Sequence, residues 1–280
     1  MADAGAAGTF DIADMTVNRL GFGAMRITGK GVWGDPPDRE SARTVLHRAV
    51  ELGVNLIDTA DSYGPAVSEE LIAEALYPYP DGLVIATKGG LERSGPGQWH
   101  RNGRPDHLRE ACDGSLKRLR LERIDLYQLH APDPQVPVAE SLGELNALQN
   151  EGKIRHIGVS NFNVEELKQA RELSTVVSVQ NRYNVGDREH EPVLEACERD
   201  GLGFLPWFPL GAGSIEHGAL EDVASRHGAS LMQIALAWLL HKSPAMLPIP
   251  GTSSVEHLEE NVAAAAIELS DADLAALDAR

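Results

Sequence analysis

The chain has 280 residues, of which 42% are hydrophobic and 24% are charged, as in a globular protein large enough to bury a sizeable core. Its 42 Asp and Glu residues outnumber the 25 Lys and Arg residues, which gives a net charge of −17 at pH 7. Because no basic residues cluster to offset phosphate charge, we expect neither nucleic acid nor an anionic membrane surface as a partner. Any anionic cofactor must be held by local groups rather than by the field of the whole protein.

The N-terminal segment and the cysteines both indicate a cytoplasmic protein. The segment MADAGAAGTFDIADM is small and acidic, without the basic start and long apolar stretch of a signal peptide. No apolar run approaches the length of a membrane span. Cys112 and Cys197, the only cysteines, lie far apart in helical-looking segments, which favours a reduced pair. The composition favours neither a monomer nor an oligomer.

Short strand-like runs alternate with amphipathic helical patterns along the chain. The strand-like runs cover residues 18–25, 55–60, 83–88, 125–130, 156–161, 177–184, 203–210 and 246–252. Apolar residues at helical spacing fill residues 40–53, 106–119, 138–152 and 164–174. A strand followed by a helix, repeated about eight times in a chain of this length, is typical of a (β/α)₈ TIM barrel in the α/β class.

The alternative to a barrel is an open doubly wound sheet. The glycines of LGFG, residues 20–23, lack the third glycine of a dinucleotide-binding fingerprint, and no helix follows at once. No linker or low-complexity segment divides the chain, so we expect a single domain over residues 1–280. The last helical pattern, residues 269–279, precedes only Arg280, which predicts a short C-terminal tail.

Polar side chains gather where the predicted strands end. In a barrel, functional groups collect at the C-terminal ends of the strands. Six such positions come from different strands: Asp58, Lys88, His130, Asn161, Gln180 and Trp207. Residues 89–107 form a long segment rich in Gly and Pro after the third predicted strand, and loops of that length are usually lids or binding loops. The sequence therefore predicts a site at this end of the barrel.

Several motifs together resemble the aldo-keto reductase superfamily across essentially the whole chain. They are IDTADSYG (57–64), ATK (86–88), LYQLH (126–130), GVSNF (158–162), VQNRYN (179–184) and IPGTSSVEHLEEN (249–261). The resemblance implies a (β/α)₈ barrel and an NADP(H)-dependent carbonyl reductase, with no metal ion. It also implies a catalytic tetrad of Asp58, Tyr63, Lys88 and His130.

Chemistry gives each member of the tetrad a reason. A carbonyl accepts hydride efficiently only if the developing alkoxide is protonated or stabilised. Tyr63 would be the acid, and because a free phenol has a pKa near ~10, a buried Lys88 would be needed to lower it. Asp58 would keep Lys88 charged, and His130 would orient the carbonyl oxygen. Taken singly, Asp58 is also compatible with a helix cap, Tyr63 with a half-buried aromatic and His130 with a core histidine.

The resemblance also assigns cofactor contacts. Ser160, Asn161 and Gln180 would bind the nicotinamide carboxamide, and Trp207 would stack on the ring, where relatives commonly have tyrosine. The remaining positions are Leu210 and Gly211 for the pyrophosphate, Thr252 and Ser253 for the 2′-phosphate, and Glu260 and Asn261 for the adenine. Where many members carry lysine and arginine on the 2′-phosphate, this chain has Gly251 and His257. NADP(H) is therefore favoured, with weaker discrimination against NAD(H).

The substrate is less well specified. The segments at 17–46, 74–88 and 205–211 are most similar to the branch of bacterial pyridoxine 4-dehydrogenase (pyridoxal reductase) enzymes. That similarity implies a fairly open aromatic pocket bounded by the side chains of Arg26, Trp33 and Trp99 as substrate contacts. Trp33 and Trp99 are equally compatible with a role in anchoring the loops. A broad-range or pathway-specific carbonyl reductase is the alternative within the family.

Two other function classes remain to be distinguished. Lys88 could serve as the nucleophile of a Schiff-base aldolase on the same fold, although the tyrosine and the carboxamide-binding set argue against it. A non-catalytic, nucleotide-sensing partner is the other alternative. The intact tetrad and the absence of any docking extension argue against that role.

Overall fold

The computed structural model describes residues 2–211 and 218–279. Seven parallel strands form one curved sheet in the order β11-β10-β9-β8-β5-β4-β3. Their bounds are β3 Phe22–Gly23, β4 Leu56–Asp58, β5 Val84–Gly89, β8 Ile124–Leu129, β9 Ile154–Ser160, β10 Val176–Arg182 and β11 Gly203–Trp207. The strands are buried on both faces, which is why they read as nearly continuous apolar runs. The predicted TIM-barrel fold is confirmed.

Residues 245–250 occupy the eighth position and join the two edges of the sheet. The Leu247 amide donates to the Phe204 carbonyl on β11 (2.8 Å), and the Gly21 amide, just before β3, donates to the Pro248 carbonyl (2.9 Å). Pro248 and Pro250 have no N–H, so this segment cannot build a regular ladder. The predicted strand at 246–252 is therefore an extended segment that closes the barrel without forming a regular β-strand.

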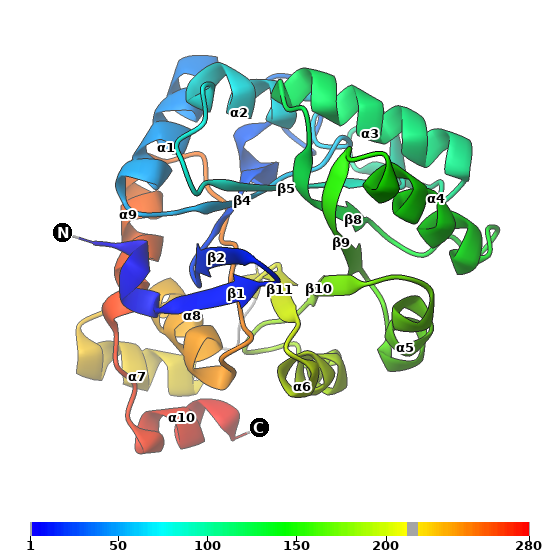
Figure 1. Cartoon of the computed structure of the whole chain (residues 1–280). Coiled ribbons are helices and arrows are strands. Elements are labelled where there is room, and N and C mark those ends of the chain that lie inside the picture. Colours follow the sequence, from blue (N-terminus) through cyan, green and yellow to red (C-terminus); the bar gives the residue numbers. More distant parts are fainter. Residues whose placement is uncertain (1, 212–217, 280) are drawn as a thin grey trace.

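The helices surround the sheet (Figure 1). They are α1 Arg39–Glu51, α2 Val67–Leu76, α3 Pro105–Leu119, α4 Val138–Asn150, α5 Val164–Leu173, α6 Glu191–Asp200, α7 Gly218–His227, α8 Leu231–Lys242, α9 Val255–Ala263 and α10 Asp271–Asp278. Short 3₁₀ turns cover Ala4–Ala7, Ala24–Ile27 and Ala264–Ala266. The four helical patterns predicted at 40–53, 106–119, 138–152 and 164–174 correspond to α1, α3, α4 and α5. Within the described ranges, no helix is both long enough and apolar enough to cross a membrane.

Two antiparallel hairpins lie outside the main sheet. Strands β1 (Thr9–Ile12) and β2 (Met15–Asn18) pack Ile12, Met15 and Val17 against the first residues of the barrel strands, in one apolar cluster. This hairpin closes the amino-terminal end of the barrel (Figure 1). Strands β6 (Leu91–Gly95) and β7 (Gln98–Arg101) follow β5 at the opposite, carboxyl end. The segment predicted as a loop at 89–107 is thus largely a hairpin.

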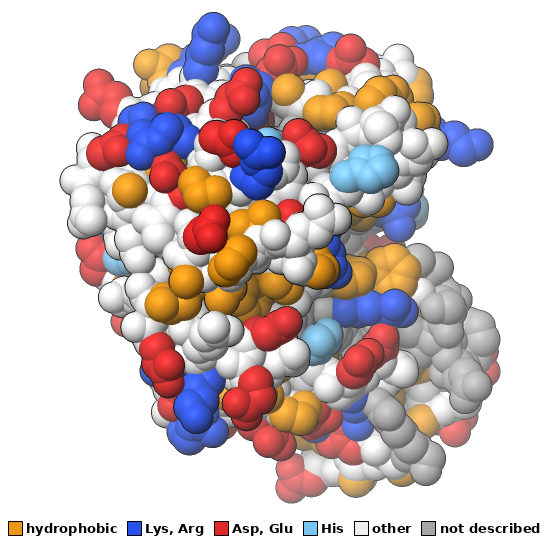
Figure 2. All heavy atoms as spheres, turned by 90° about the vertical axis from the view of Figure 1, so that its right-hand side faces the viewer, with side chains coloured by type: hydrophobic (Ala, Val, Ile, Leu, Met, Phe, Trp, Pro, Cys, Tyr) orange, Lys and Arg blue, Asp and Glu red, His pale blue; other side chains and the backbone are white. Residues whose placement is uncertain are grey.

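The surface carries mixed charge on the face drawn in Figure 2. Blue Lys and Arg side chains lie singly among red Asp and Glu side chains there, and a hollow containing orange side chains opens at one edge of this view. This distribution agrees with the excess of acidic residues in the sequence.

Candidate active site

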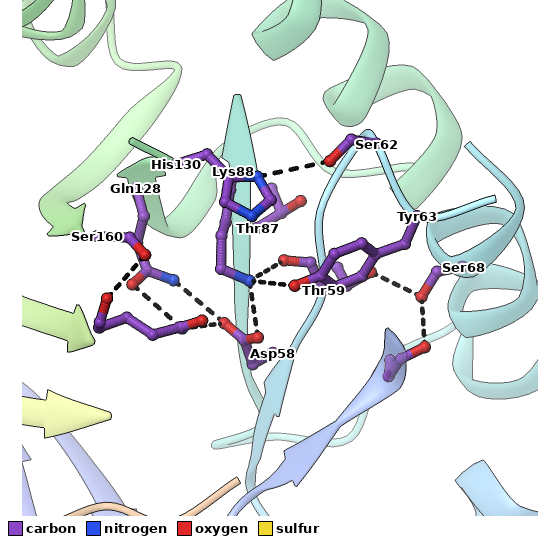
Figure 3. A network of polar contacts seen from close by, with 12 residues as sticks. Asp58, Thr59, Ser62, Tyr63, Ser68, Thr87, Lys88, Gln128, His130 and Ser160 are labelled. Carbon is purple, nitrogen blue, oxygen red and sulfur yellow. Dashed lines mark hydrogen bonds and ion pairs between the residues drawn. The ribbon is translucent and has the colours of Figure 1, made fainter. Parts of the chain in front are cut away.

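Lys88 is the centre of a buried polar network at the carboxyl end of the barrel. Its ammonium group donates to Asp58 Oδ2 (2.7 Å), to the Thr59 carbonyl (2.7 Å) and to Tyr63 Oη (3.3 Å). These three acceptors use all three N–H donors of a lysine. Figure 3 shows Lys88 reaching from β5 toward Asp58, with the Tyr63 ring on one side and His130 close by. Four residues predicted from three separate motifs therefore lie close together.

Asp58 is held from both of its carboxylate oxygens. Oδ2 binds Lys88, while Oδ1 accepts from Gln180 Nε2 (2.8 Å) and Gln128 Nε2 (3.2 Å). Burying a carboxylate costs free energy unless it is paired and hydrogen-bonded, and these contacts meet both conditions. Gln128 is not among the predicted site residues, although it belongs to the LYQLH motif and lies opposite Lys88 in the β5–β8 ladder. This explains why a buried strand can end in an aspartate.

Burial and charge act in opposite directions on Lys88 and Tyr63. Burial favours the neutral amine of Lys88, but the Asp58 carboxylate outweighs it, and the pKa of Lys88 is raised. Burial also raises the pKa of Tyr63, and the nearby ammonium of Lys88 lowers it only in part. Lys88 therefore acts in the expected direction, but the phenol keeps its proton throughout the neutral range. Tyr63 is a proton donor in its resting state.

His130 is a neutral imidazole. Burial, together with the positive charges of Lys88 and Arg93, lowers the pKa of His130 well below its usual value. Its Nδ1 lies 3.5 Å from Ser62 Oγ, and its ring lies edge-on to the Tyr63 ring with centroids 5.9 Å apart. A neutral imidazole can donate one hydrogen bond to a carbonyl oxygen without adding a charge to the site.

A cavity of about 820 Å³ opens above this network, within the usual size range of ligand sites. Most of the predicted site residues line it: Arg26, Asp58, Tyr63, Trp99, His130, Ser160, Asn161, Gln180, Trp207, Leu210, Gly251, Thr252, Ser253 and His257. Five others are not part of its lining: Trp33, Lys88, Gly211, Glu260 and Asn261. Of these, Lys88 reaches the cavity through Tyr63 and Asp58, which do line it.

The predicted nicotinamide contacts are ordered by hydrogen bonds among themselves. Ser160 Oγ donates to the Gln180 carbonyl (2.7 Å), and Asn161 Nδ2 donates to the His130 carbonyl (2.9 Å). Trp207 Nε1 donates to Asn161 Oδ1 (3.0 Å), which fixes the indole relative to the amide. Asn161 has a positive φ of 62°, a conformation that asparagine adopts more readily than most residues. These contacts fix the Asn161 amide and the Trp207 indole on the cavity wall. An amide and an aromatic ring are the groups expected to bind a ligand that is itself an aromatic ring bearing an amide.

The same cavity extends to the start of α9, where an anion can be held. Ser254 caps this helix, and Thr252 Oγ1 accepts from the Ser254 amide (3.1 Å). Helix N-termini favour negative charge because their amides point outward and the helix dipole is positive there. A Cβ on Gly251 would lie 2.4 Å from the Gly23 carbonyl oxygen. The absence of a lysine at position 251 therefore has a steric reason, and Arg26 and His257 are the lining side chains that can carry a positive charge near it. The residues present fit a phosphate-bearing dinucleotide.

Trp99 and Trp33 have different environments. Trp99 lines the cavity with 37% of its surface exposed, and its ring centroid lies 6.3 Å from Tyr63 and 6.4 Å from His130. Trp33 contacts the Arg93 guanidinium instead, 5.8 Å from the ring centroid. Among the described residues, no group of three or more His, Cys, Asp and Glu side chains is placed to hold a metal ion.

Comparison with known proteins identifies relatives along nearly the whole chain. A model of the Aldo/keto reductase family matches residues 19–280. An uncharacterized oxidoreductase of Schizosaccharomyces pombe is 52% identical over 278 residues, covering 99% of this chain and 90% of that protein. Pyridoxine 4-dehydrogenase of Escherichia coli is 44% identical over 278 residues, covering 96% and 97%.

Solved structures agree with this result. The glycerol dehydrogenase of Gluconobacter oxydans superimposes with a TM-score of 0.88 at 30% identity, covering 98% of this chain and 94% of that one. An aldo/keto reductase from Klebsiella pneumoniae in complex with NADP and acetate superimposes with a TM-score of 0.79 at 28% identity, covering 94% and 91%.

Proposed function

The chain belongs to the aldo/keto reductase family, and from this premise we propose that it catalyses reversible hydride transfer between NADP(H) and a small-molecule carbonyl or alcohol. The main observation in support of this reaction is that the buried Lys88 contacts both Asp58 and Tyr63, beside a neutral His130. Such an arrangement provides a proton donor and an oxygen-binding group at the mouth of a closed barrel.

In this mechanism the side chains handle the proton and the charge. Bound NADPH supplies the hydride for the carbonyl carbon. His130 donates a hydrogen bond to the carbonyl oxygen, and Tyr63 transfers its phenolic proton to that oxygen as alkoxide character develops. Lys88 stabilises the phenolate that remains, and Asp58 keeps Lys88 protonated. In the direction of alcohol oxidation, the Tyr63 phenolate takes back the same proton.

Cofactor preference follows from the α9 end of the cavity. We assign the 2′-phosphate to Thr252, Ser253 and the helix N-terminus, with His257 on α9 as its basic partner and Arg26 as a second basic side chain on the cavity lining. A neutral histidine binds phosphate less strongly than the fixed fork of arginine. NADPH is therefore preferred over NADH by a modest factor.

The substrate is a carbonyl compound that fits an aromatic pocket, and pyridoxal is the first candidate. The pocket beside Tyr63 and His130 is bounded by Trp99, with Trp207 elsewhere on the lining. Flat aromatic aldehydes suit such walls. The similarity to Escherichia coli pyridoxine 4-dehydrogenase supports interconversion of pyridoxal and pyridoxine. A broader carbonyl reductase is the second candidate, since a glycerol dehydrogenase shares the fold closely. The sequence favours action in the cytoplasm.

Lys88 is a poor candidate for a Schiff-base nucleophile. Its ammonium is fully buried, it donates to three acceptors, and its pKa is raised. A nucleophilic lysine needs a lowered pKa, so that a neutral amine is present. The environment of Lys88 thus supports an electrostatic role beside Tyr63 over an aldolase.

The test is cofactor oxidation with NADPH and, separately, NADH against pyridoxal, benzaldehyde and a panel of other aldehydes and ketones. Fast turnover of pyridoxal with NADPH would support both the reaction and the substrate. Turnover of other carbonyls alone would keep the reaction and remove pyridoxal. No oxidation of either cofactor with any carbonyl would refute the proposed function.

A further inference from the structure

Arg93 on β6 makes an unusually complete set of contacts for a side chain outside the tetrad. Its guanidinium donates to five backbone carbonyls: Gly31 (2.8 Å), Val32 (2.7 Å), Ser62 (3.0 Å), Gly95 (3.3 Å) and Gln98 (3.0 Å). An arginine side chain has five N–H donors. Every one of them is therefore used, and none remains free for a ligand.

These acceptors lie on three separate segments. Gly31 and Val32 belong to the loop before α1, Ser62 directly precedes Tyr63, and Gly95 and Gln98 flank the turn between β6 and β7. Arg93 therefore ties the loop that carries the tyrosine to the hairpin that carries Trp99. Strand β7 is exposed throughout and β6 is exposed at alternate residues, so little apolar burial holds the hairpin in place.

The flat face of the same guanidinium packs on an indole. The central carbon of Arg93 lies 3.6 Å from the Trp99 ring centroid, while Trp33 lies at 5.8 Å. Trp99 in turn presents an edge-on contact to Tyr63 and to His130. Arginine stacks on aromatic faces because its charge is delocalised over a planar group. The orientation of Trp99 against the two catalytic rings is thus linked to one arginine.

We propose that Arg93 is a positioning residue that fixes Trp99 and the Tyr63 loop around the reacting carbonyl, and so confers a preference for flat aromatic substrates. The inference rests on the proposed carbonyl reduction but assigns a role to a residue that never touches substrate. Lysine would keep the positive charge at this position, but it has three N–H donors and no planar group. It therefore cannot make all five hydrogen bonds to the backbone carbonyls or stack on the Trp99 ring.

The experiment compares Arg93→Met and Arg93→Lys with wild type, using Arg101→Met as the matched control. Arg101 lies on β7 of the same hairpin and donates to the Pro132 carbonyl, away from Trp99. For Arg93→Met we expect KM for benzaldehyde to rise about tenfold, with kcat/KM for propanal changing less than about threefold, because only the aromatic substrate uses the Trp99 wall. The affinity for NADPH should be unchanged, and Arg93→Lys should resemble Arg93→Met.

A double variant tests whether Arg93 affects the aromatic substrate through Trp99. If Arg93 acts through Trp99, then Arg93→Met combined with Trp99→Leu should cost less on benzaldehyde than the product of the two single losses. Equal losses on benzaldehyde and propanal, independent effects of the two changes, or a similar loss in Arg101→Met would each overturn the proposal. Should Arg93→Met fail to fold, Arg93→Lys with Trp99→Leu supports the same comparison.

Backbone hydrogen exchange provides a readout that does not depend on turnover. Arg93→Met should exchange faster than wild type in residues 29–34, 59–64 and 91–101, whereas Arg101→Met should leave the first two segments unchanged. Unaltered exchange in all three segments would overturn the proposal even if the enzyme were active. Absent turnover in the wild type with either cofactor would instead refute the proposed function, while exchange would still test the link.

Discussion

The two hairpins at opposite ends of the barrel are held by different interactions. At the amino end, β1–β2 buries Ile12, Met15 and Val17 in one apolar cluster with the barrel strands. At the carboxyl end, β7 is exposed and polar contacts hold the hairpin: Arg93 donates to Val32 and Ser62, the Gly97 amide donates to Gly31, and Arg101 donates to Pro132. Apolar burial is non-directional and seals a core, whereas oriented polar contacts place a side chain at a chosen point. The same motif thus stabilises the fold at one end and shapes a site at the other.

The largest expected effect is on catalysis at the carboxyl end. Replacing Tyr63 with Phe removes the proton donor, and carbonyl reduction should fall by about 10²- to 10⁴-fold, the usual contribution of a positioned acid. The affinity for NADPH should stay close to wild type because the ring remains, whereas the thermal midpoint should fall slightly because Lys88 loses one of its three acceptors. The measurement is kcat for carbonyl reduction beside cofactor titration. Tyr77→Phe, at a half-exposed position outside the cavity, is the control, and unchanged turnover in Tyr63→Phe would refute the acid role.

The complementary change acts at the amino end. Ile12 is fully buried in the apolar cluster, so Ile12→Ala should lower the free energy of unfolding by about 2–5 kcal/mol, the usual cost of such a truncation. Values of kcat and KM at low temperature should be unchanged, since the site lies at the other end of the barrel. Chemical denaturation measures the first quantity, with the exposed Thr9→Ala as the control. A selective loss of activity without a loss of stability would contradict the division between the two ends.

A smaller effect is expected where the cavity meets α9. Because Gly251 leaves no room for a side chain, a cation for the 2′-phosphate comes from another lining residue. Of Arg26 and His257, which both line the cavity, His257 is the one that lies on α9. His257→Arg should raise the ratio of kcat/KM for NADPH over NADH by about 3- to 10-fold, since arginine is always charged and binds phosphate through two donors. His257→Gln is the matched control and should leave the ratio nearly unchanged. A fall in the ratio with arginine would place the 2′-phosphate elsewhere.

The sequence alone predicted the features of this molecule that depend on local patterns of residues, namely the order of strands and helices and the motifs at the strand ends. The alternation of strands and helices gave the barrel, and family motifs at strand ends named Asp58, Tyr63, Lys88 and His130, which meet in the structure. Residues 246–252 looked like a strand by their apolar content, but prolines at 248 and 250 prevent a ladder there. A hydrophobic pattern indicates which face of a helix or strand is buried, but it does not indicate which hydrogen bonds a side chain makes.

What could not be predicted depends on contacts between distant segments. Arg93 looks like an ordinary charge in a Gly-rich loop, because its acceptors at Val32 and Ser62 lie 61 and 31 residues away. The support of Asp58 by Gln128 has the same origin, because the two residues are separated by 70 positions in the sequence. The direction in which the pKa of Tyr63 shifts could not be predicted either. Burial raises this pKa by more than Lys88 lowers it, and the extent of burial is known only from the packed structure.

The smallest expected effect returns to the amino-terminal hairpin and concerns its pH dependence. Asp14, in the turn between β1 and β2, pairs with Arg155 and His156, and hydrogen bonds to these two residues lower its pKa from 3.8 to about 2. A carboxyl group with a lowered pKa stabilises the folded state above its unfolded pKa and loses that contribution as pH falls toward its folded pKa. Since the pair is exposed, the contribution is small.

The thermal midpoint of Asp14→Asn should therefore lie slightly below that of wild type above pH 5. The gap should narrow from about pH 4 and close below pH 2, where both carboxyl and amide are neutral. Asp11→Asn, on β1 of the same hairpin and without an ion pair to Arg155, separates this effect from a general loss of negative charge. A gap that stays constant from pH 6 to pH 3 would show that the ion pair does not support this hairpin, whose attachment would then rest on apolar burial and on the hydrogen bonds between Asn55 and both Thr16 and Asn18.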